Sequence, residues 1–438
     1  MPNSKIFCNI PWYELHINHD GSYDLCGCMS SLITQTDTAQ EWNIRNYPIE
    51  EYWNSRRLRD ERLSKMGDIP NPACGVCQYQ DSIGNHSKRI KENLKSVVFY
   101  DRFDRSYQQS PHREIFEYSL NNDGASTTKP VSYHLSLGNE CDLACIMCSP
   151  NASYKLGRDY QALGWMPQAQ RLNWTDDQTS WNHVCETLAN TDALLSLHII
   201  GGEPTINKRF TELIDFFVTK GKTDFSFSFT TNCMHPIDHL WDRLSKFKRV
   251  EVGLSLETVT ESNNYVRYGS NINTILFNIA EFKRNAPPNV DFVIRTVPTF
   301  LTITEYDQVI DWCYDNEFLL NSYFAVDPLW QQIKLLPREI KLELQTRFQR
   351  QLERYQQLQS IEQRGLTNFR NQSRYLDSIV NEARAAKNAV MDMSTDPVLI
   401  SDAVERFSRL DRYRCTDVTT VFPMLKEFFT QNGYTNKI

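Results

Sequence analysis

Three cysteines in one short segment are the residues of this sequence that point most directly to chemistry. Cys141, Cys145 and Cys148 follow a C-x3-C-x2-C spacing. Thiolates are the usual protein ligands of iron–sulfur clusters, so these three side chains can hold three irons of a cubane [4Fe–4S] cluster. A fourth cysteine at matching distance is missing from the sequence, so one iron stays open for a small molecule. A zinc site is the alternative, although zinc sites favour paired C-x2-C ligands or a histidine.

A second segment, Gly201-Gly202-Glu203-Pro204, follows the apolar run 194–200 directly. Two glycines let a ligand approach the backbone closely. The neighbouring carboxylate can accept hydrogen bonds from an ammonium group. A plain turn is the alternative when this segment is taken alone, but its place after the cysteine segment favours a binding site.

These two motifs together resemble the radical S-adenosylmethionine (SAM) superfamily. The resemblance implies that Cys141, Cys145 and Cys148 hold a [4Fe–4S] cluster whose open iron binds SAM. It also implies that Gly201, Gly202 and Glu203 bind the SAM amino group. One departure is Met147, which stands where the family usually has an aromatic residue.

Three later residues extend the resemblance. Ser255 and Glu257 end the fourth predicted strand and are similar to a Ser-x-Asp pair of the family, which implies contacts with the SAM ribose or carboxylate. Arg267 resembles an arginine that pairs with the SAM carboxylate in some relatives, and an exposed helix arginine is the equal alternative. Arg295 lies inside a predicted strand, where its charge needs a partner, so it is either a pocket residue or part of a structural ion pair.

The first hundred residues contain a second set of cysteines. The segment Cys8 to Trp12, the Asp20-Gly21 turn before Cys26, the segment Tyr52 to Ser55 and the stretch Cys74 to Arg89 resemble the twitch or SPASM accessory domain. The resemblance implies an auxiliary [4Fe–4S] cluster on Cys8, Cys26, Cys74 and Cys77. Cys28 is the alternate to Cys26, because the chain has Cys26-Gly27-Cys28 where the family has adjacent cysteines. A structural zinc site remains the alternative for this unit.

The elements that position these residues alternate between strand and helix patterns. Residues 131–137, 194–200, 225–229, 250–256, 292–297 and 323–326 are predicted strands. Helical patterns lie between them, including 210–221 and 272–282. This alternation predicts a parallel α/β sheet, and the resemblance implies an incomplete (β/α)6 TIM-like barrel. Active sites of parallel barrels lie at the carboxyl ends of the strands, where the cysteine segment falls.

We predict four regions: a small α+β cluster-binding unit over 1–100, a linker over 101–130, the partial barrel over 131–330 and a mostly helical region over 331–438. The first unit contains a predicted hairpin of strands 12–18 and 22–25 and a helix over 49–66 that Gly67 ends. Phe422 to Phe429 predicts a final helix that docks on the core. The remaining cysteines are predicted to be small buried apolar residues: Cys185, Cys233, Cys313 and Cys415.

The composition limits the classes of molecule that the chain is expected to bind. The chain has 438 residues and a formal net charge of −7, which argues against bulk nucleic-acid binding. We find no signal peptide and no apolar run long enough for a membrane span, so we expect a cytoplasmic protein. The resemblance implies a one-electron donor such as flavodoxin or ferredoxin, and a peptide, protein or small-molecule substrate. Rival functions are a zinc-stabilised binding protein on a degenerate barrel, a radical SAM dehydrogenase of a small molecule and polar methyl transfer from SAM.

Overall fold

The computed structural model describes residues 6–28, 42–67, 69–93, 112–363 and 372–436. Its centre is an eight-stranded sheet in the order β10-β9-β7-β6-β5-β3-β1-β2, parallel throughout except for the antiparallel pair β1–β2. Strands β4 (Ala144–Cys145) and β8 (Arg267–Tyr268) form a separate antiparallel pair. The strands of the large sheet are β1 Glu14–Ile17, β2 Tyr23–Asp24, β3 Ser132–Ser136, β5 Ser196–Ile200, β6 Ser226–Thr231, β7 Arg249–Ser255, β9 Val290–Thr296 and β10 Leu319–Ser322.

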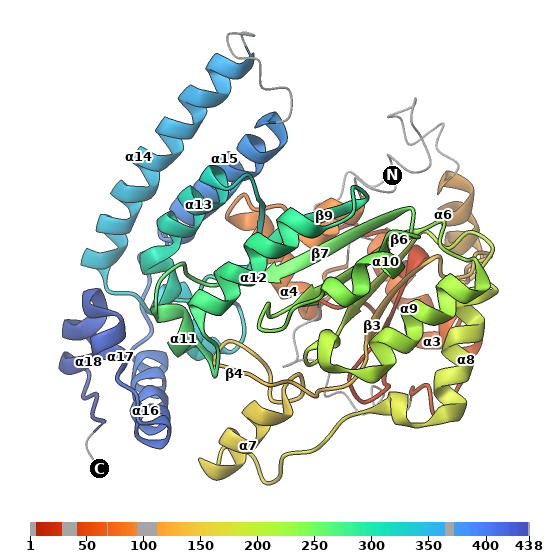
Figure 1. Ribbon diagram of the computed structural model, residues 1–438, viewed down its shortest axis with the longest axis horizontal. Helices are drawn as coiled ribbons and strands as arrows, with labels where there is room; N and C mark the ends of the chain where they lie inside the picture. The colour runs from red at the N-terminus through yellow and green to blue at the C-terminus, as the bar shows by residue number, and fades with distance from the viewer. Residues whose placement is uncertain (1–5, 29–41, 68, 94–111, 364–371, 437–438) are drawn as a thin grey trace.

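Helices connect the parallel strands and cover the sheet (Figure 1). Helix α9 illustrates the cause: Phe210, Leu213, Ile214 and Phe217 recur at helical spacing, are all buried, and face the core. The helix ends at Gly221, whose φ of 65° suits glycine. The mixed α/β architecture with a largely parallel sheet agrees with the predicted partial barrel. The connecting helices are α7 Tyr154–Ala162, α8 Gln178–Ala189, α9 Lys208–Lys220, α10 Trp241–Leu244, α11 Ser262–Val266, α12 Ile272–Asn285 and α13 Tyr306–Asp315.

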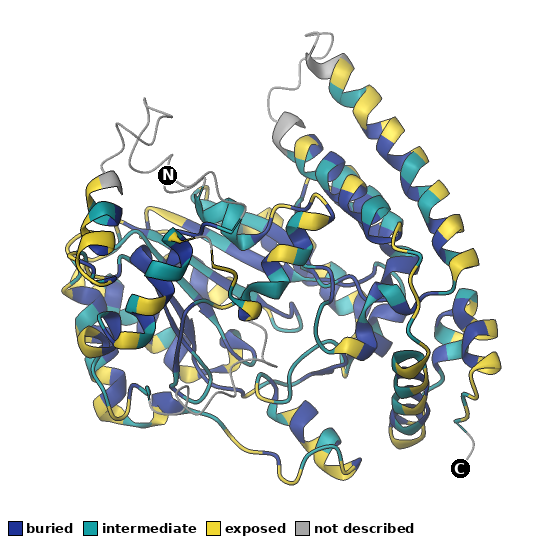
Figure 2. Cartoon of the chain, turned by 180° about the vertical axis from the view of Figure 1, so that it is seen from behind, coloured by how far each residue is buried: buried dark blue, intermediate teal, exposed yellow. Residues whose placement is uncertain are grey.

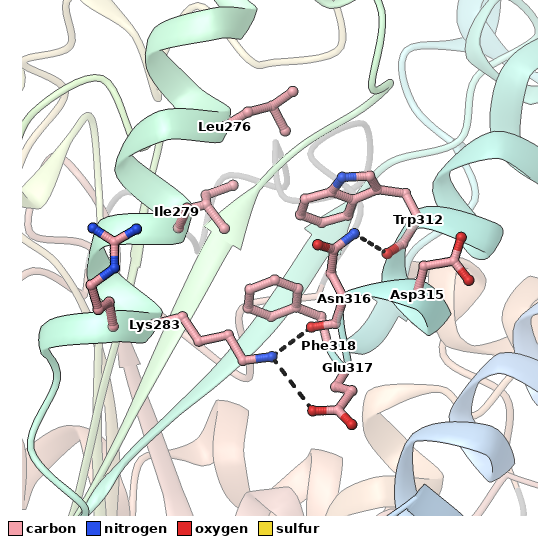
Figure 3. A pocket seen from close by; sticks show the side chains of 10 residues that line it. Leu276, Ile279, Lys283, Trp312, Asp315, Asn316, Glu317 and Phe318 are labelled. Atoms are coloured by element: carbon pink, nitrogen blue, oxygen red, sulfur yellow. Dashed lines mark hydrogen bonds and ion pairs between the residues drawn. The ribbon is translucent and has the colours of Figure 1, made fainter.

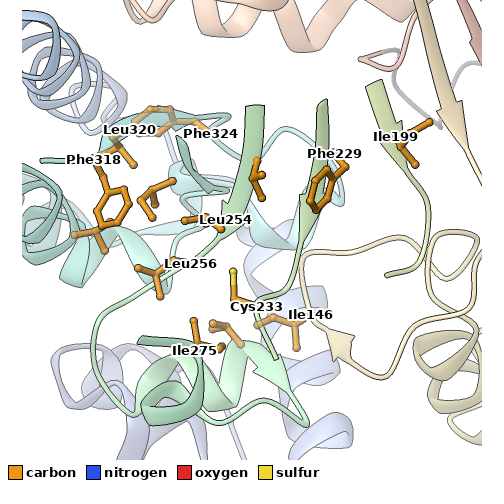
Figure 4. Packing of buried hydrophobic residues seen from close by; sticks show 14 of the residues in the cluster. Ile146, Ile199, Phe229, Cys233, Leu254, Leu256, Ile275, Phe318, Leu320 and Phe324 are labelled. Atoms are coloured by element: carbon orange, nitrogen blue, oxygen red, sulfur yellow. The ribbon is translucent and has the colours of Figure 1, made fainter. Parts of the chain in front are cut away.

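The core lies between this sheet and its helices (Figures 2 and 4). Cys233 lies in it beside Ile146 and Ile275 (Figure 4). Cys185, Cys233 and Cys313 are buried, as predicted. The prediction for Cys415 is wrong, because this residue is exposed and ends helix α16 in a left-handed conformation with a φ of 54°.

The N-terminal unit contains the predicted hairpin, but two local predictions need correction. Pro11 lies in the first turn of a short helix α1 (Ile10–Tyr13), so the first strand starts at Glu14 rather than at residue 12. The predicted helix 49–66 is two helices, because extended Ser55 ends one and caps the next, accepting a hydrogen bond from the Leu58 N–H. The helices of this unit are α1 Ile10–Tyr13, α2 Ile49–Trp53, α3 Arg56–Met66 and α4 Gly75–Ser82.

The predicted linker contains a helix, α6 (His112–Asn121), while residues 101–111 lie outside the described residues. Phe116 on α6 packs edge-on against the Trp12 ring, at 4.8 Å between centroids. The Trp12 indole N–H donates to the Ser119 hydroxyl at 2.8 Å. This helix therefore holds the start of the chain against the body of the protein.

The N-terminal unit extends the sheet on one side and contacts the strand at its opposite edge. On one side β1 pairs with β3. On the other side Gln80 of α4 donates to the Phe324 carbonyl at 2.9 Å and accepts from the Phe324 N–H at 3.1 Å. The Asn85 side chain donates to the Ser322 carbonyl at 2.9 Å. The unit therefore bridges the edge of β3 and the end of β10.

These Gln80 bonds also explain why the last strand prediction is wrong. The strand is β10 (Leu319–Ser322), and residues 323–326 follow it as a loop. Both backbone groups of Phe324 are satisfied by one side chain instead of a neighbouring strand. An apolar run alone does not reveal such a partner 244 residues away.

The C-terminal region is helical, as predicted, and packs on the sheet edge. The Glu382 carboxylate on α15 accepts from the Ser322 N–H at 3.1 Å and from the Tyr306 hydroxyl at 3.0 Å. Phe422, Phe428 and Phe429 are buried, which confirms the predicted docking. No helix among the described residues is apolar over a length that would span a membrane. The C-terminal helices are α14 Arg338–Gln363, α15 Gln372–Ala389, α16 Pro397–Arg414, α17 Val418–Val421 and α18 Lys426–Gln431.

Candidate metal centre and cofactor site

The cysteine loop leaves the carboxyl end of β3 and is held by a two-stranded ladder. Ala144 and Cys145 form β4, which pairs with Tyr268 and Arg267 of β8. The Cys148 N–H donates to the Cys145 carbonyl at 3.1 Å and closes the loop. The loop backbone is therefore fixed on both sides of its middle cysteine.

The three thiols of this loop are close enough to influence one another electrostatically. Burial raises the pKa of Cys148 to about 12, and nearby Cys145 raises it further. Burial is also the main cause that raises the pKa of Cys141, with Cys145 and Cys148 adding to it. A buried set of thiols needs positive charge to become thiolates, and metal ions supply such charge.

Across the described ranges, no three His, Cys, Asp or Glu side chains converge so that they could hold one metal ion. The thiolates of a cubane cluster each bind a different iron, so they need not converge on one point. The donor set fits a cluster, because three thiols from one loop approach one another beside a glycine cradle.

That cradle is formed by Gly201 and Gly202, which follow β5. A Cβ on Gly202 would lie 1.8 Å from the Glu140 carbonyl oxygen, and one on Gly201 would lie 2.7 Å from that of Gly138. The Glu203 N–H donates to the same Glu140 carbonyl at 2.8 Å. The segment therefore packs directly on the backbone that leads into Cys141, which only glycine permits.

Glu203 is buried and holds two strand ends together. One carboxylate oxygen accepts from the Thr205 N–H and hydroxyl at 3.1 and 2.8 Å, and the other accepts from the Asn232 N–H at 2.6 Å. Burial raises the pKa of this carboxyl. The carboxylate therefore binds the end of β6, while the backbone N–H of the same residue binds the segment before Cys141.

Glu257 and Arg267 form a buried ion pair at 3.0 Å. The second oxygen of Glu257 accepts from the Thr296 hydroxyl at 2.9 Å and the Val297 N–H at 2.7 Å. Arg267 lies opposite Cys145 in the β4–β8 pair and is only 8% exposed, so the alternative of an exposed helix arginine is wrong. Its Nε–H has no hydrogen-bond partner among the described residues and can still serve a ligand.

Ser255 and Arg295 lie in register on β7 and β9. Ser255 is half-buried at the last position of β7. Arg295 forms an ion pair with Glu251 at 3.0 Å and contacts the His198 ring nitrogen at 3.2 Å. Arg295 was predicted to be either a pocket residue or part of a structural ion pair, and the structure contains the ion pair.

Sequence reasoning missed Arg414, which reaches the cysteine loop from α16. It donates to the Ala144 carbonyl at 2.8 Å and pairs with Asp159 of α7 at 2.7 Å. Its guanidinium lies 4.3 Å from the Tyr268 ring centroid. An arginine at the end of a distant helix gives no local signal of this role.

Asp142, between the first two cysteines, was also missed. Its carboxylate accepts from the Asn232 amide at 2.7 Å and contacts the His235 ring nitrogen at 3.0 Å. The residues after β6 are therefore tied to the cysteine loop through this side chain.

The N-terminal cysteines also gather. Burial raises the pKa of Cys8 to about 12, with Cys77 and Cys74 contributing. Burial raises the pKa of Cys26, and nearby Cys77 and Cys8 raise it further. A hydrogen bond from the Cys28 thiol lowers the pKa of Cys77 to about 6. The choice between Cys26 and Cys28 as a ligand stays open, because both lie within this group.

Gly27 has a physical reason to stand between these two cysteines. A Cβ there would lie 2.4 Å from Cε1 of His134 and 2.9 Å from Nδ1 of His16. The two imidazole rings are stacked at 4.5 Å, and burial lowers the pKa of both. A second cysteine directly after Cys26 would collide with this pair.

Two of the cavities among the described residues are relevant to the candidate site and its surroundings. One, of about 540 Å³, lies between α12 and α13 and is lined by Ile279, Lys283, Trp312 and Phe318, among others (Figure 3). The Lys283 ammonium there donates to the Asn316 carbonyl at 2.6 Å. The other, of about 290 Å³, opens on Cys141.

Comparisons with known proteins give one family match and several similar solved structures. The family model described as the radical SAM superfamily matches residues 135–313. Among curated proteins, none matches the chain. Solved structures with similarity include hexahistidine-tagged anSMEcpe with bound AdoMet (19% identity, TM-score 0.39, covering 51% of this chain and 60% of that one). Another is Streptococcus suis SuiB bound to S-adenosylmethionine (16% identity, TM-score 0.36, covering 70% and 64%).

The chain thus spans less than two thirds of the length of these two structures. A third similar structure is SuiB bound to the precursor peptide SuiA (16% identity, TM-score 0.37, covering 67% and 60%). The family match covers the cysteine loop, the glycine segment and Arg267. Residues 135–313 therefore match the radical SAM superfamily, and a domain of that superfamily implies an enzyme.

Proposed function

We propose that the enzyme cleaves SAM reductively and uses the resulting radical to abstract hydrogen from a substrate. The observation that carries the proposal is the packing of Gly201 and Gly202 on the backbone just before Cys141. A cofactor that bridges an open iron and the glycine segment would need the two to be neighbours. Cys141, Cys145 and Cys148 would hold a [4Fe–4S] cluster, which would supply the electron for reductive cleavage of the C5′–S bond of SAM.

Within this proposal Cys141, Cys145 and Cys148 hold the cluster and the glycine segment admits the SAM amino group. Glu203 accepts hydrogen bonds from that ammonium in addition to those from Thr205 and Asn232. The Arg267 Nε–H, which has no partner within the described part of the chain, donates to the SAM carboxylate or ribose. Ser255 and Glu257 line the same ends of the strands.

We further propose that Cys8, Cys74 and Cys77, with Cys26 or Cys28, hold an auxiliary [4Fe–4S] cluster. The mutual influence of their thiols supports this set. A peptide or protein is our proposed substrate class, on the basis of the resemblance of residues 8–89 to an accessory domain of peptide-modifying relatives. We place the cluster-binding unit within residues 1–100 and the barrel within 131–330.

The test is a triple substitution of Cys141, Cys145 and Cys148 by alanine. Anaerobically reconstituted wild-type protein should bind about eight irons, as two four-iron clusters imply, and form 5′-deoxyadenosine from SAM. The triple variant should retain about four irons and form none. Product from the triple variant would refute the cysteine assignment, and a wild-type protein with four irons and one zinc would make the N-terminal unit a zinc module.

A further inference from the structure

We propose that the basic cavity beside Cys141 is the docking surface of an acidic one-electron donor protein. This inference rests on the proposed function, because only a redox-active cluster on the cysteine loop needs such a donor. It adds the place at which the electron enters and the charge of the partner that delivers it.

The cavity joins a candidate cluster ligand to a rim of positive charge. Its wall includes Cys141, the three cations Lys155, Arg158 and Arg171, and the single carboxylate Glu140. All three cations are exposed. The chain as a whole carries a formal net charge of −7. The net charge of the molecule repels an acidic partner, whereas this rim attracts it locally, which is how charge steers association.

The cations are held in place around the cavity. Lys155 and Arg158 lie three positions apart on α7, so they share one face of that helix. The Lys155 ammonium donates to the Asp142 carbonyl at 2.6 Å, next to Cys141. The Arg171 guanidinium lies 5.0 Å from the Tyr154 ring centroid and 4.0 Å from the exposed Glu140 carboxylate. These contacts keep the positive charges at fixed places around the cavity in the folded protein.

The occupant is better described as a protein that touches the rim than as a ligand that fills the hollow. At about 290 Å³ the cavity is at the lower limit of small-molecule sites. Electron-transfer partners form small, transient, charge-guided contacts. One electron leaves the reduced carrier of the donor and enters the oxidised cluster through the Cys141 side, with no bond formed and no proton transferred. The carboxylates of Glu203 and Glu257 are buried and take no part in this electron transfer.

The experiment measures cluster reduction by a purified, negatively charged flavodoxin in stopped flow, at low and high ionic strength. The variant is Arg158→Glu combined with Arg171→Glu, which changes the rim from net positive to net negative. The matched control is Lys222→Glu combined with Lys246→Glu, two exposed lysines just before β6 and β7, at the opposite ends of the strands.

The rim variant should lower the second-order reduction rate at least about tenfold at low salt and should lose the salt dependence of the wild type. The control should keep the wild-type rate. After full chemical reduction by titanium(III) citrate, the rim variant should form 5′-deoxyadenosine at the wild-type single-turnover rate, because neither arginine touches the cofactor in the proposed site.

An unchanged rate with flavodoxin, or an equal loss in the control, would overturn the docking surface. Loss of affinity for a poly-glutamate peptide with an unchanged flavodoxin rate would also overturn it, in favour of an acidic peptide site. If chemically reduced wild-type protein formed no 5′-deoxyadenosine, the proposed function itself would fail, and the docking proposal with it.

Discussion

Arg414 donates a hydrogen bond to the carbonyl of Ala144, between the first two cysteines of the candidate cluster loop, at 2.8 Å. The same guanidinium neutralises Asp159, and both side chains are buried. The C-terminal region is thus part of the structure that fixes the loop.

Replacing Arg414 by glutamine should lower the free energy of unfolding by about 3–5 kcal/mol, because Asp159 would be left buried without its partner. Iron bound at the cysteine loop should fall as well. Urea titration and iron analysis check both effects. Arg412→Gln, an exposed change on the same helix, is the control and should stay within about 0.5 kcal/mol. An Arg414 variant as stable as this control would remove Arg414 from the support of the loop.

Glu203→Gln should weaken SAM binding about ten- to a hundred-fold, since it removes a charge-assisted hydrogen bond of about 1.5–3 kcal/mol. The amide nitrogen would also face an N–H donor at Asn232 or Thr205, so unfolding should become easier by about 1–3 kcal/mol. SAM titration, followed by the paramagnetic resonance of the reduced cluster, measures the affinity. Glu261→Gln, an exposed change, is the control. Unchanged affinity would leave Glu203 as a purely structural link.

Gly202→Ala should be far more damaging than Gly164→Ala, although both glycines have positive φ, 55° and 71°. A Cβ at Gly164 meets nothing within 4 Å, so only the left-handed backbone cost of about 1 kcal/mol applies. At Gly202 the Cβ would collide with the Glu140 carbonyl, and we expect a loss of about 2–4 kcal/mol together with loss of SAM binding. Equal stability of the two variants would contradict the cradle.

Glu382 should make the protein less stable as the pH rises. Burial raises the pKa of this carboxyl, so the folded state holds the proton over a range in which the unfolded chain has released it. Stability from this group is therefore present below its usual pKa of about 4.3 and is lost as the pH rises through the higher folded value. Glu382→Gln should remove a slope of up to about 1.4 kcal/mol per pH unit within that window. Urea unfolding of both proteins at several pH values measures it, and identical slopes would contradict it.

The parts of the site with local signals were predictable. The cysteine spacing, the double glycine after β5 and the helix stop at Gly221 each depend on neighbours in sequence. Arg267 was placed near the site by resemblance, but its burial depends on β8 pairing with β4, about 120 residues earlier in the chain. Arg414 and Gln80 were not predictable, because their partners lie 270 and 244 residues away and no local pattern encodes such contacts.

The bridge that the N-terminal unit makes between β3 and β10 has a consequence for the order of folding. Gln80 and Asn85 cannot make their bonds to Phe324 and Ser322 until those residues have left the ribosome. Closing loops of this length is slow, because the entropy cost precedes the contacts that offset it. During synthesis the contacts of the first unit with residues 322–324 therefore remain unformed while more than two hundred further residues are added. Its cysteines are incompletely enclosed over that time. A cluster held by these cysteines, as proposed above, would be loaded most easily in that interval, before the late contacts close the structure.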